Sequence, residues 1–331
     1  MAHDIEAVVE QAENMLGRPE MPVSRHIFVT GANGFIGSAL CRFLAAQGAK
    51  VTALMRRPPA QALPEGVEAM LLPSYDALEP RHLQGHEAVI HLAGHAHAAH
   101  MNPAQRGRAF AEDVRLARLA AGCAATAGAK RFVFVSTIKV LGEQSGALPF
   151  DHRSIPAPAD AYARARLAGE QAVREVAEAA GMEWIVVRPV LVVGEGARGN
   201  LDALLRWISA GRPLPFAGMN NRRSLIGLED LCELLACCAV HPHAAGRTFI
   251  ASGDETVSTT DICVALAEGL GVRPRLFRVP RWLWSMARAF PPTRGLEQRL
   301  AGSLQADNTE TRRLLGWQPR MRARDCLFRL A

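Results

Sequence analysis

The sequence lacks the segments that would take it into or across a membrane. No uninterrupted apolar run approaches the ~20 residues of a membrane-spanning helix. The opening segment, MAHDIEAVVEQAENMLG, carries acidic residues and has no apolar stretch, so we expect no signal peptide. Residues 1–22 are predicted to form a helical extension, and the protein is expected to be cytoplasmic.

Metal-binding spacings are missing as well. None of the seven cysteines forms a C-x-x-C pair, and most lie in apolar helical patterns, which favours buried free thiols in a reducing compartment. A group of histidines (His91, His95, His97 and His100) follows a predicted strand, but no carboxylate lies at matching intervals. We therefore predict no metal site.

Charge is present but not concentrated. The net charge is +6, and the arginines are scattered along the chain. An acidic small ligand such as a nucleotide accounts for this balance as well as nucleic acid does, and we expect no nucleic-acid partner. Hydrophobic residues make up 49% and charged residues 21% of the chain, which is ordinary for a globular enzyme.

From His26 onward, short apolar runs alternate with helical stretches. The continuous apolarity of the runs favours strands buried on both faces, and strands separated by helices favour an α/β fold with a doubly wound parallel sheet. This domain is predicted over residues 23–190, with 224–252 returning to it. After Pro189 the segments become shorter and richer in glycine and proline, so residues 191–223 and 253–331 are assigned to a smaller C-terminal lobe that binds the substrate.

The first predicted strand, HIFVT, runs directly into a G-x-x-G-x-x-G turn that opens a helix. Glycines in this position permit a tight turn and let a pyrophosphate approach the backbone amides at the helix N-terminus, as in the Rossmann fold. The expected dinucleotide contacts are Gly31, Asn33, Gly34, Phe35, Ile36 and Gly37.

The end of the second strand indicates which dinucleotide binds. An acidic residue there would hold the ribose 2′-hydroxyl of NAD, but the sequence reads Met55-Arg56-Arg57. Two guanidinium groups suit a 2′-phosphate, so NADP is favoured over NAD. The alternative is that both arginines are solvated loop charges.

Several motifs together resemble the extended short-chain dehydrogenases/reductases, the NAD-dependent epimerase/dehydratase family. They are TGANGFIG, HLAG at 91–94, FVFVSTIKVLGE at 132–143, the DAYARAR segment containing Tyr162, and RP at 188–189. The resemblance implies a Ser/Thr, a Tyr and a Lys at the nicotinamide, which correspond to Thr137, Tyr162 and Arg166. It also implies cofactor contacts at Leu92, Ala93, Tyr162, Arg166 and Pro189.

The sequence departs from the family pattern at three places. Arg166 replaces the family lysine, four residues after Tyr162 and on the same helix face. The acid that usually meets the adenine is absent, with Pro73-Ser74 in its place, and Asp113 stands where the family commonly has asparagine. Because a guanidinium is not equivalent to an ammonium, a non-catalytic dinucleotide sensor remains an alternative to a working enzyme.

Among the sugar-nucleotide branches of the family, dehydratases carry an Asp-Glu pair after the threonine, whereas this chain has Ile138-Lys139. This difference argues against a dehydratase. The STIKVLGE, HLAGHAHAAH and GNLDALLRWISAGRPLPFAGMNNRRSL segments resemble most the reductases of UDP-4-keto-6-deoxy-N-acetylhexosamines in polysaccharide synthesis, and the missing NAD-type acid agrees, with a UDP-hexose 4-epimerase holding NAD as the alternative. The resemblance implies a nucleotide-sugar partner and a homodimer. The expected substrate contacts are His97, Lys139, Asn200, Arg223 and Arg299.

Overall fold

The computed structural model describes residues 25–59, 62–95, 101–197, 199–279 and 302–331. The predicted helical extension (1–22) and two predicted substrate contacts, His97 and Arg299, lie outside these residues.

A seven-stranded parallel sheet forms the centre of the molecule, in the order β3-β2-β1-β4-β5-β6-β9. Its central strands are buried along their whole length, which explains their continuous apolar sequences. The strands are β1 (His26–Thr30), β2 (Lys50–Met55), β3 (Val67–Leu71), β4 (Ala88–His91), β5 (Arg131–Val135), β6 (Glu183–Pro189) and β9 (Arg247–Ala251).

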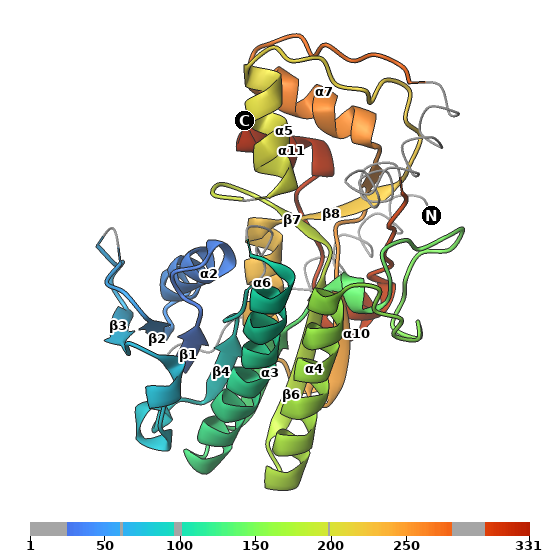
Figure 1. Cartoon of the computed structure of the whole chain (residues 1–331). Coiled ribbons are helices and arrows are strands. Elements are labelled where there is room, and N and C mark those ends of the chain that lie inside the picture. Colours follow the sequence, from blue (N-terminus) through green and yellow to red (C-terminus); the bar gives the residue numbers. More distant parts are fainter. Residues whose placement is uncertain (1–24, 60–61, 96–100, 198, 280–301) are drawn as a thin grey trace, which may run out of the picture.

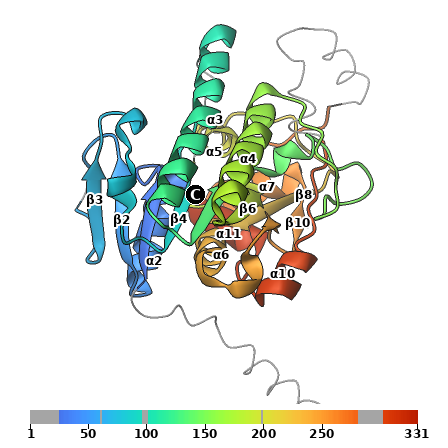
Figure 2. The same cartoon turned by 90° about the horizontal axis from the view of Figure 1, so that it is seen from below.

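Helices cover both faces of this sheet. One face carries α3 and α4 side by side, and the other carries α2 and α6 (Figures 1 and 2). The predicted doubly wound α/β fold is therefore confirmed. The helices are α2 (Phe35–Ala46), α3 (Pro103–Thr126), α4 (Ala161–Ala180) and α6 (Leu228–Val240), with short 3-10 turns η1 (Tyr75–Ala77), η2 (Pro80–Leu83), η3 (Ile138–Val140) and η4 (Pro242–Ala244).

The strand order reverses at β1, which pairs with β2 on one side and β4 on the other. In this register Thr30 lies beside Leu54 and His91, so the three strands end at nearly the same level. Loops that leave the carboxyl ends of strands at such a reversal enclose a crevice, the usual ligand site of doubly wound sheets.

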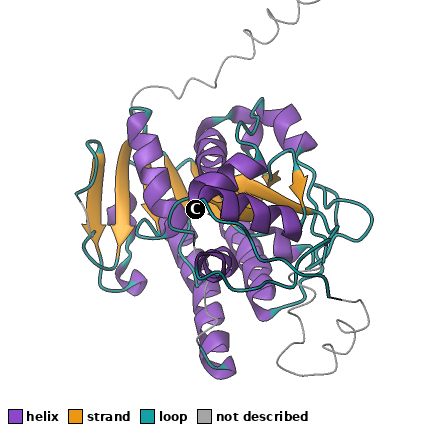
Figure 3. Ribbon diagram, turned by 90° about the horizontal axis from the view of Figure 1, so that it is seen from above, coloured by secondary structure: helices purple, strands orange, loops and turns teal. Residues whose placement is uncertain are grey.

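A smaller lobe lies beyond this carboxyl edge and has a hydrophobic core of its own (Figures 1 and 3). Strand β8 belongs to the lobe's three-stranded sheet, so within 224–252 it is α6 and β9 that pack with the main sheet. The lobe elements are β7 (Leu191–Val193), α5 (Asn200–Ser209), β8 (Arg223–Gly227), β10 (Thr256–Val257), α7 (Thr259–Gly269) and α11 (Ala323–Leu330), while α10 (Thr309–Leu315) packs beside β9.

All seven cysteines are free and buried, as their apolar surroundings predicted. Burial raises the pKa of the Cys41 and Cys232 thiols to about 12, so both stay protonated and unreactive. Among the described residues, no helix is long and apolar enough to cross a membrane. The same part of the chain holds no cluster of three or more histidine, cysteine, aspartate or glutamate side chains arranged for a metal ion.

Candidate active site

The glycine-rich turn is shaped by backbone contacts that leave no room for side chains. Gly31 has a φ of +72°, and a Cβ there would lie 2.8 Å from the backbone nitrogen of Ala93. A Cβ on Gly37 would overlap the carbonyl oxygen of Gly31, toward which Gly34 donates its own N–H at 2.9 Å. The cap residue Gly34 has no side chain to occupy the first N–H groups of α2. The turn therefore fits a pyrophosphate at the helix N-terminus.

We expect Gly37→Ala to weaken the binding of a nicotinamide dinucleotide, with NADPH as the probe, by about tenfold or more. The added methyl must push Gly31 aside, and such overpacking costs about 1–3 kcal/mol, where 1.4 kcal/mol is about tenfold in affinity. Fluorescence titration with NADPH would measure the loss. Gly122→Ala on α3 is the matched control because a Cβ there meets nothing within 4 Å. Equal NADPH affinity in wild type and Gly37→Ala would contradict this account of the turn.

The predicted phosphate-binding arginines stand next to this turn. Arg56 and Arg57 follow β2 at its carboxyl end, and both side chains are exposed. The side-chain amide of Asn33 donates to the carbonyl oxygen of Arg57 at 2.9 Å and so ties the arginine segment to the glycine-rich turn. The backbone of the arginine segment is thereby held beside the place where the adenosine end of a dinucleotide would lie.

Tyr75 is a site residue that the sequence reasoning missed. It follows the Pro73-Ser74 pair, and its hydroxyl accepts the N–H of Gly31 at 2.9 Å. Burial raises the pKa of this phenol, so it stays neutral beside the turn. The available signal was its rarity, since the chain has only two tyrosines.

The segment after β4 lies directly against the glycine-rich turn. Leu92 and Ala93 follow the strand, and the N–H of Ala93 donates to the hydroxyl of Thr30 at 3.3 Å. That hydroxyl also meets Nδ1 of His91 at 3.0 Å. Burial lowers the pKa of His91 to about 3, so this histidine is a neutral core residue.

Tyr162 lies in the first turn of α4. The carboxylate of Asp160 caps this helix by accepting the N–H of Ala163 at 2.7 Å. The tyrosine ring is half-buried against Phe110 of α3, with ring centres 5.8 Å apart. Burial raises the pKa of the Tyr162 phenol, and the charge of Arg166 opposes that rise. The phenol is therefore protonated at neutral pH and able to donate its proton.

Arg166 stands one helical turn further on and is only 6% exposed. Its guanidinium lies 4.5 Å from the centre of the Phe134 ring and donates a hydrogen bond to the carbonyl oxygen of Val135. The cation at the position of the family lysine is thus fixed against the end of β5, close enough to Tyr162 to oppose the rise in the pKa of its phenol that burial causes.

Thr137 caps η3, directly after β5, and its hydroxyl accepts the N–H of Lys139 at 3.4 Å. The ammonium of Lys139 lies 2.9 Å from the carboxylate of Asp160 and 3.6 Å from that of Glu143. This lysine therefore links η3 to the cap of the helix that carries Tyr162.

A buried ionic cluster that no sequence motif indicated joins α4, β6 and the segment after β5. Glu170 of α4 accepts two hydrogen bonds from Arg188 of β6, at 3.0 and 2.7 Å. It also accepts the hydroxyl of Ser136 at 2.5 Å. The carboxylate and the guanidinium are 2% and 9% exposed, so each charge depends on the other.

Of the predicted substrate residues that the structure describes, Lys139 lies on η3 in the main domain, whereas Asn200 and Arg223 lie on the lobe. Asn200 begins α5 and is exposed. Arg223 begins β8, donates to the carbonyl oxygen of Gly302 at 3.1 Å, and has its pKa lowered by burial. Pro189 ends β6, where the chain passes from the main sheet to the lobe.

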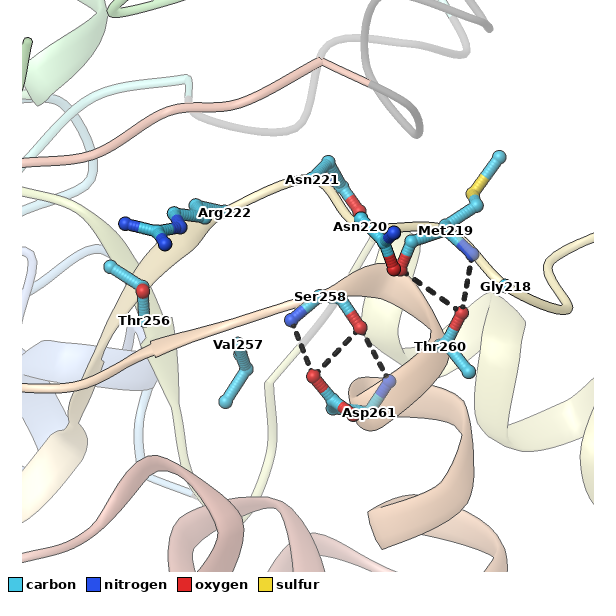
Figure 4. Close-up of a pocket in the computed structure, with 10 residues that line it drawn as sticks. All are labelled: Gly218, Met219, Asn220, Asn221, Arg222, Thr256, Val257, Ser258, Thr260 and Asp261. Carbon is cyan, nitrogen blue, oxygen red and sulfur yellow. Dashed lines mark hydrogen bonds between the residues drawn. The ribbon is translucent and has the colours of Figure 1, made fainter. Parts of the chain in front are cut away.

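A polar hollow of about 580 Å³ opens beside β8, between residues 218–222 and the start of α7 (Figure 4). Ser258 and Asp261 cap α7 by accepting each other's backbone N–H groups, and the hydroxyl of Thr260 accepts the N–H of Met219 at 3.0 Å. The lining is therefore rich in amide and hydroxyl groups.

A family model and several known proteins match most of this chain. The family model described as "NAD dependent epimerase/dehydratase family" matches residues 27–251. A UDP-glucose 4-epimerase of Vibrio cholerae is 31% identical over 92% of this chain and 93% of that protein. A dTDP-6-deoxy-L-talose 4-dehydrogenase (NAD(P)(+)) of Kitasatospora kifunensis is 29% identical over 92% of this chain and 94% of that protein.

The structure is also similar to solved ones. The crystal structure of UDP-glucuronic acid 4-epimerase from Bacillus cereus in complex with NAD aligns with a TM-score of 0.75, at 20% identity, over 92% of this chain and 95% of that one. At that identity the likeness shows the shared fold.

Proposed function

Because the chain belongs to the NAD dependent epimerase/dehydratase family, we propose that it uses NADPH to reduce a nucleotide-activated 4-keto sugar of the UDP-4-keto-6-deoxy-N-acetylhexosamine type. Its homologues make it an NAD(P)-dependent oxidoreductase or epimerase. A role in surface polysaccharide synthesis, and a homodimer that pairs through the exposed faces of α3 and α4, are parts of the same proposal.

One observation favours a reductase over an epimerase. Arg56 and Arg57 stand exposed beside the glycine-rich turn, at the position where NAD-binding sites of this kind hold an acid. A reductase consumes NADPH in every turnover, whereas an epimerase retains its NAD. The talose 4-dehydrogenase relative supports this choice, because its name places the oxidoreduction at a sugar C4 and allows NAD(P).

In the proposed reaction each residue of the site has a separate role. A bound nicotinamide would supply the hydride to C4. Tyr162 donates its phenolic proton to the developing alkoxide oxygen, and the hydroxyl of Thr137 hydrogen-bonds the same oxygen. Arg166 holds positive charge beside the phenol as it ionises. On the lobe, Arg223 and Asn200 bind the diphosphate of the substrate.

The direct test mixes purified protein with UDP-4-keto-6-deoxy-N-acetylglucosamine and either NADPH or NADH, and follows the absorbance of the reduced nicotinamide. We expect the substrate to be reduced and NADPH to be consumed faster than NADH. Interconversion of UDP-glucose and UDP-galactose, with nicotinamide retained by the protein and no NADPH consumed, would contradict the proposal.

That outcome would identify the second candidate, a UDP-hexose 4-epimerase. The observation in its favour is the 31% identity with the Vibrio cholerae epimerase over nearly the whole chain. The same phenol would then remove and return one proton within a single catalytic cycle.

We expect the double variant Arg56→Ser, Arg57→Ser to bind NADPH about tenfold to hundredfold more weakly, with little change for NADH. Hydrogen bonds to charged groups contribute about 1.5–3 kcal/mol, and only NADPH carries the 2′-phosphate. Isothermal titration with both nucleotides would measure the difference. Arg81→Ser is the control, because Arg81 is also exposed but pairs with Glu79 before β4, at the amino ends of the strands. A parallel loss for NADH and NADPH would argue against 2′-phosphate recognition.

A further inference from the structure

We propose that His95 and Asp113 form a proton-exchange dyad that returns a proton from solvent to Tyr162 after each reduction. This inference rests on the proposed reductase function and adds a second residue pair to its chemistry. His95 acts as the proton carrier, and Asp113 is its positioning residue.

The carboxylate of Asp113 holds His95 at two points. One oxygen accepts the backbone N–H of His95 at 2.8 Å, and the other lies 2.7 Å from Nδ1 of its ring. Because an ionised carboxylate only accepts hydrogen bonds, Nδ1 carries a proton and Nε2 is left as the exchanging nitrogen. The Asp113 side chain is 4% exposed and that of His95 is 33% exposed, so the ring connects a buried charge to solvent.

The dyad lies beside the reaction centre. A Cβ on Gly94 would be 2.8 Å from Nη1 of Arg166 and 3.3 Å from Oδ2 of Asp113, so both charges converge on the residue that precedes His95. The negative charge of Asp113 also reaches Tyr162, where it raises the pKa of the phenol. Three elements thus meet here: α3 through Asp113, α4 through Arg166 and Tyr162, and the segment after β4 through His95.

A reductase needs such a route because each reduction removes one proton from the active site, and that proton must be replaced. Each turnover moves a hydride to carbon and the phenolic proton to oxygen, and so leaves Tyr162 as phenolate. One proton must then enter from solvent. In the dyad, protonated His95 gives the Nε2 proton to the phenolate through solvent, and the neutral ring is reprotonated by bulk water.

The other charged groups described around Tyr162 are poorly suited to this task. Arg166 is permanently protonated and cannot release a proton. Asp160 caps α4 and binds Lys139. Glu112 lies near His95 on the exposed side of α3 and pairs with Arg115. Histidine is the side chain that exchanges protons readily near neutral pH, and among the described residues near Tyr162 the His95 side chain is partly exposed to solvent.

The test compares His95→Gln with wild type in the NADPH-dependent reduction of UDP-4-keto-6-deoxy-N-acetylglucosamine. We expect kcat to fall by about 10²-fold, NADPH affinity to stay unchanged, and added imidazole to restore part of the rate. Asp113→Asn, which keeps an oxygen acceptor for the backbone N–H, is expected to lower kcat in the same direction. His243→Gln is the matched control, since His243 is exposed in η4, away from the carboxyl edge.

The possible outcomes separate the two proposals. If wild type reduces the substrate but His95→Gln matches its kcat and gains nothing from imidazole, the dyad is overturned and the reductase stands. If wild type consumes no NADPH with this substrate, the reductase fails, and nitrogen NMR of His95 in wild type and Asp113→Asn decides on the dyad. A proton on Nδ1 that is lost in the variant supports the pair, and an unprotonated Nδ1 in wild type overturns it.

Discussion

Replacing Tyr162 with phenylalanine is expected to lower kcat for NADPH-dependent reduction by about 10²–10⁴-fold. The substitution removes the hydroxyl that donates the proton but keeps the ring that packs against Phe110. The Kd for NADPH and the melting temperature should therefore change little. Steady-state kinetics and a thermal-shift titration with NADPH would measure the two effects separately.

The pH dependence checks the same role. Burial raises the pKa of the Tyr162 phenol above its ordinary value of about 10. Reduction requires the protonated phenol. The rate of reduction should therefore stay constant through neutral pH and fall as the pH rises past the raised pKa of Tyr162. Oxidation of the alcohol requires the phenolate, and its rate should increase over the same alkaline range.

The chain supplies its own control in the other tyrosine. Tyr75→Phe removes the acceptor of the Gly31 N–H beside the glycine-rich turn, and we expect this change to weaken NADPH binding rather than to lower kcat at saturating NADPH. If Tyr162→Phe retained wild-type kcat, or if Tyr75→Phe carried the whole loss, the assignment of the proton donor would be wrong.

Glu170→Ala is expected to cost about 3–5 kcal/mol of unfolding free energy, the largest stability effect that we predict. The substitution leaves the guanidinium of Arg188 and the hydroxyl of Ser136 buried without their shared acceptor. An unpaired charge in the sheet interior is far more costly than a lost surface contact. Urea unfolding followed by circular dichroism would measure the change.

Glu175→Ala on the same helix is the matched comparison. Its carboxylate is 64% exposed and pairs with Arg118, which is 54% exposed, so we expect a loss of about 0–1 kcal/mol. Near-equal losses for the two variants would show that the Glu170 cluster contributes no more than a surface ion pair.

Part of the fold could be predicted because it depends on local pattern. The strand that contains Phe132 and Phe134 is apolar at every position after Arg131 and buried at every position, since it lies between two layers of helices. The helix that carries Tyr162 begins at an aspartate cap and ends at Gly181, whose φ of +67° suits glycine. These features depend on a few neighbouring residues, so the sequence reveals them.

Part of the site could be predicted for the same reason. The glycine-rich turn has fixed spacing between a strand and a helix, and Tyr162 and Arg166 are one turn apart on one helix. The missing acid after β2 and the arginine pair in its place are also local features, and they support the proposed preference for NADPH.

The sequence by itself determined the doubly wound sheet, the dinucleotide turn and the helix that bears the phenol, because each follows from short-range periodicity and backbone geometry. Only the tertiary structure decided which distant groups meet. Tyr75 reaches Gly31 across 44 positions, Ser136 reaches Glu170 across 34, and Asp113 reaches His95 across 18. Each pairing depends on how separate elements pack at the carboxyl ends of the strands. The burial and the charge environment of these side chains come from residues that are distant in the sequence.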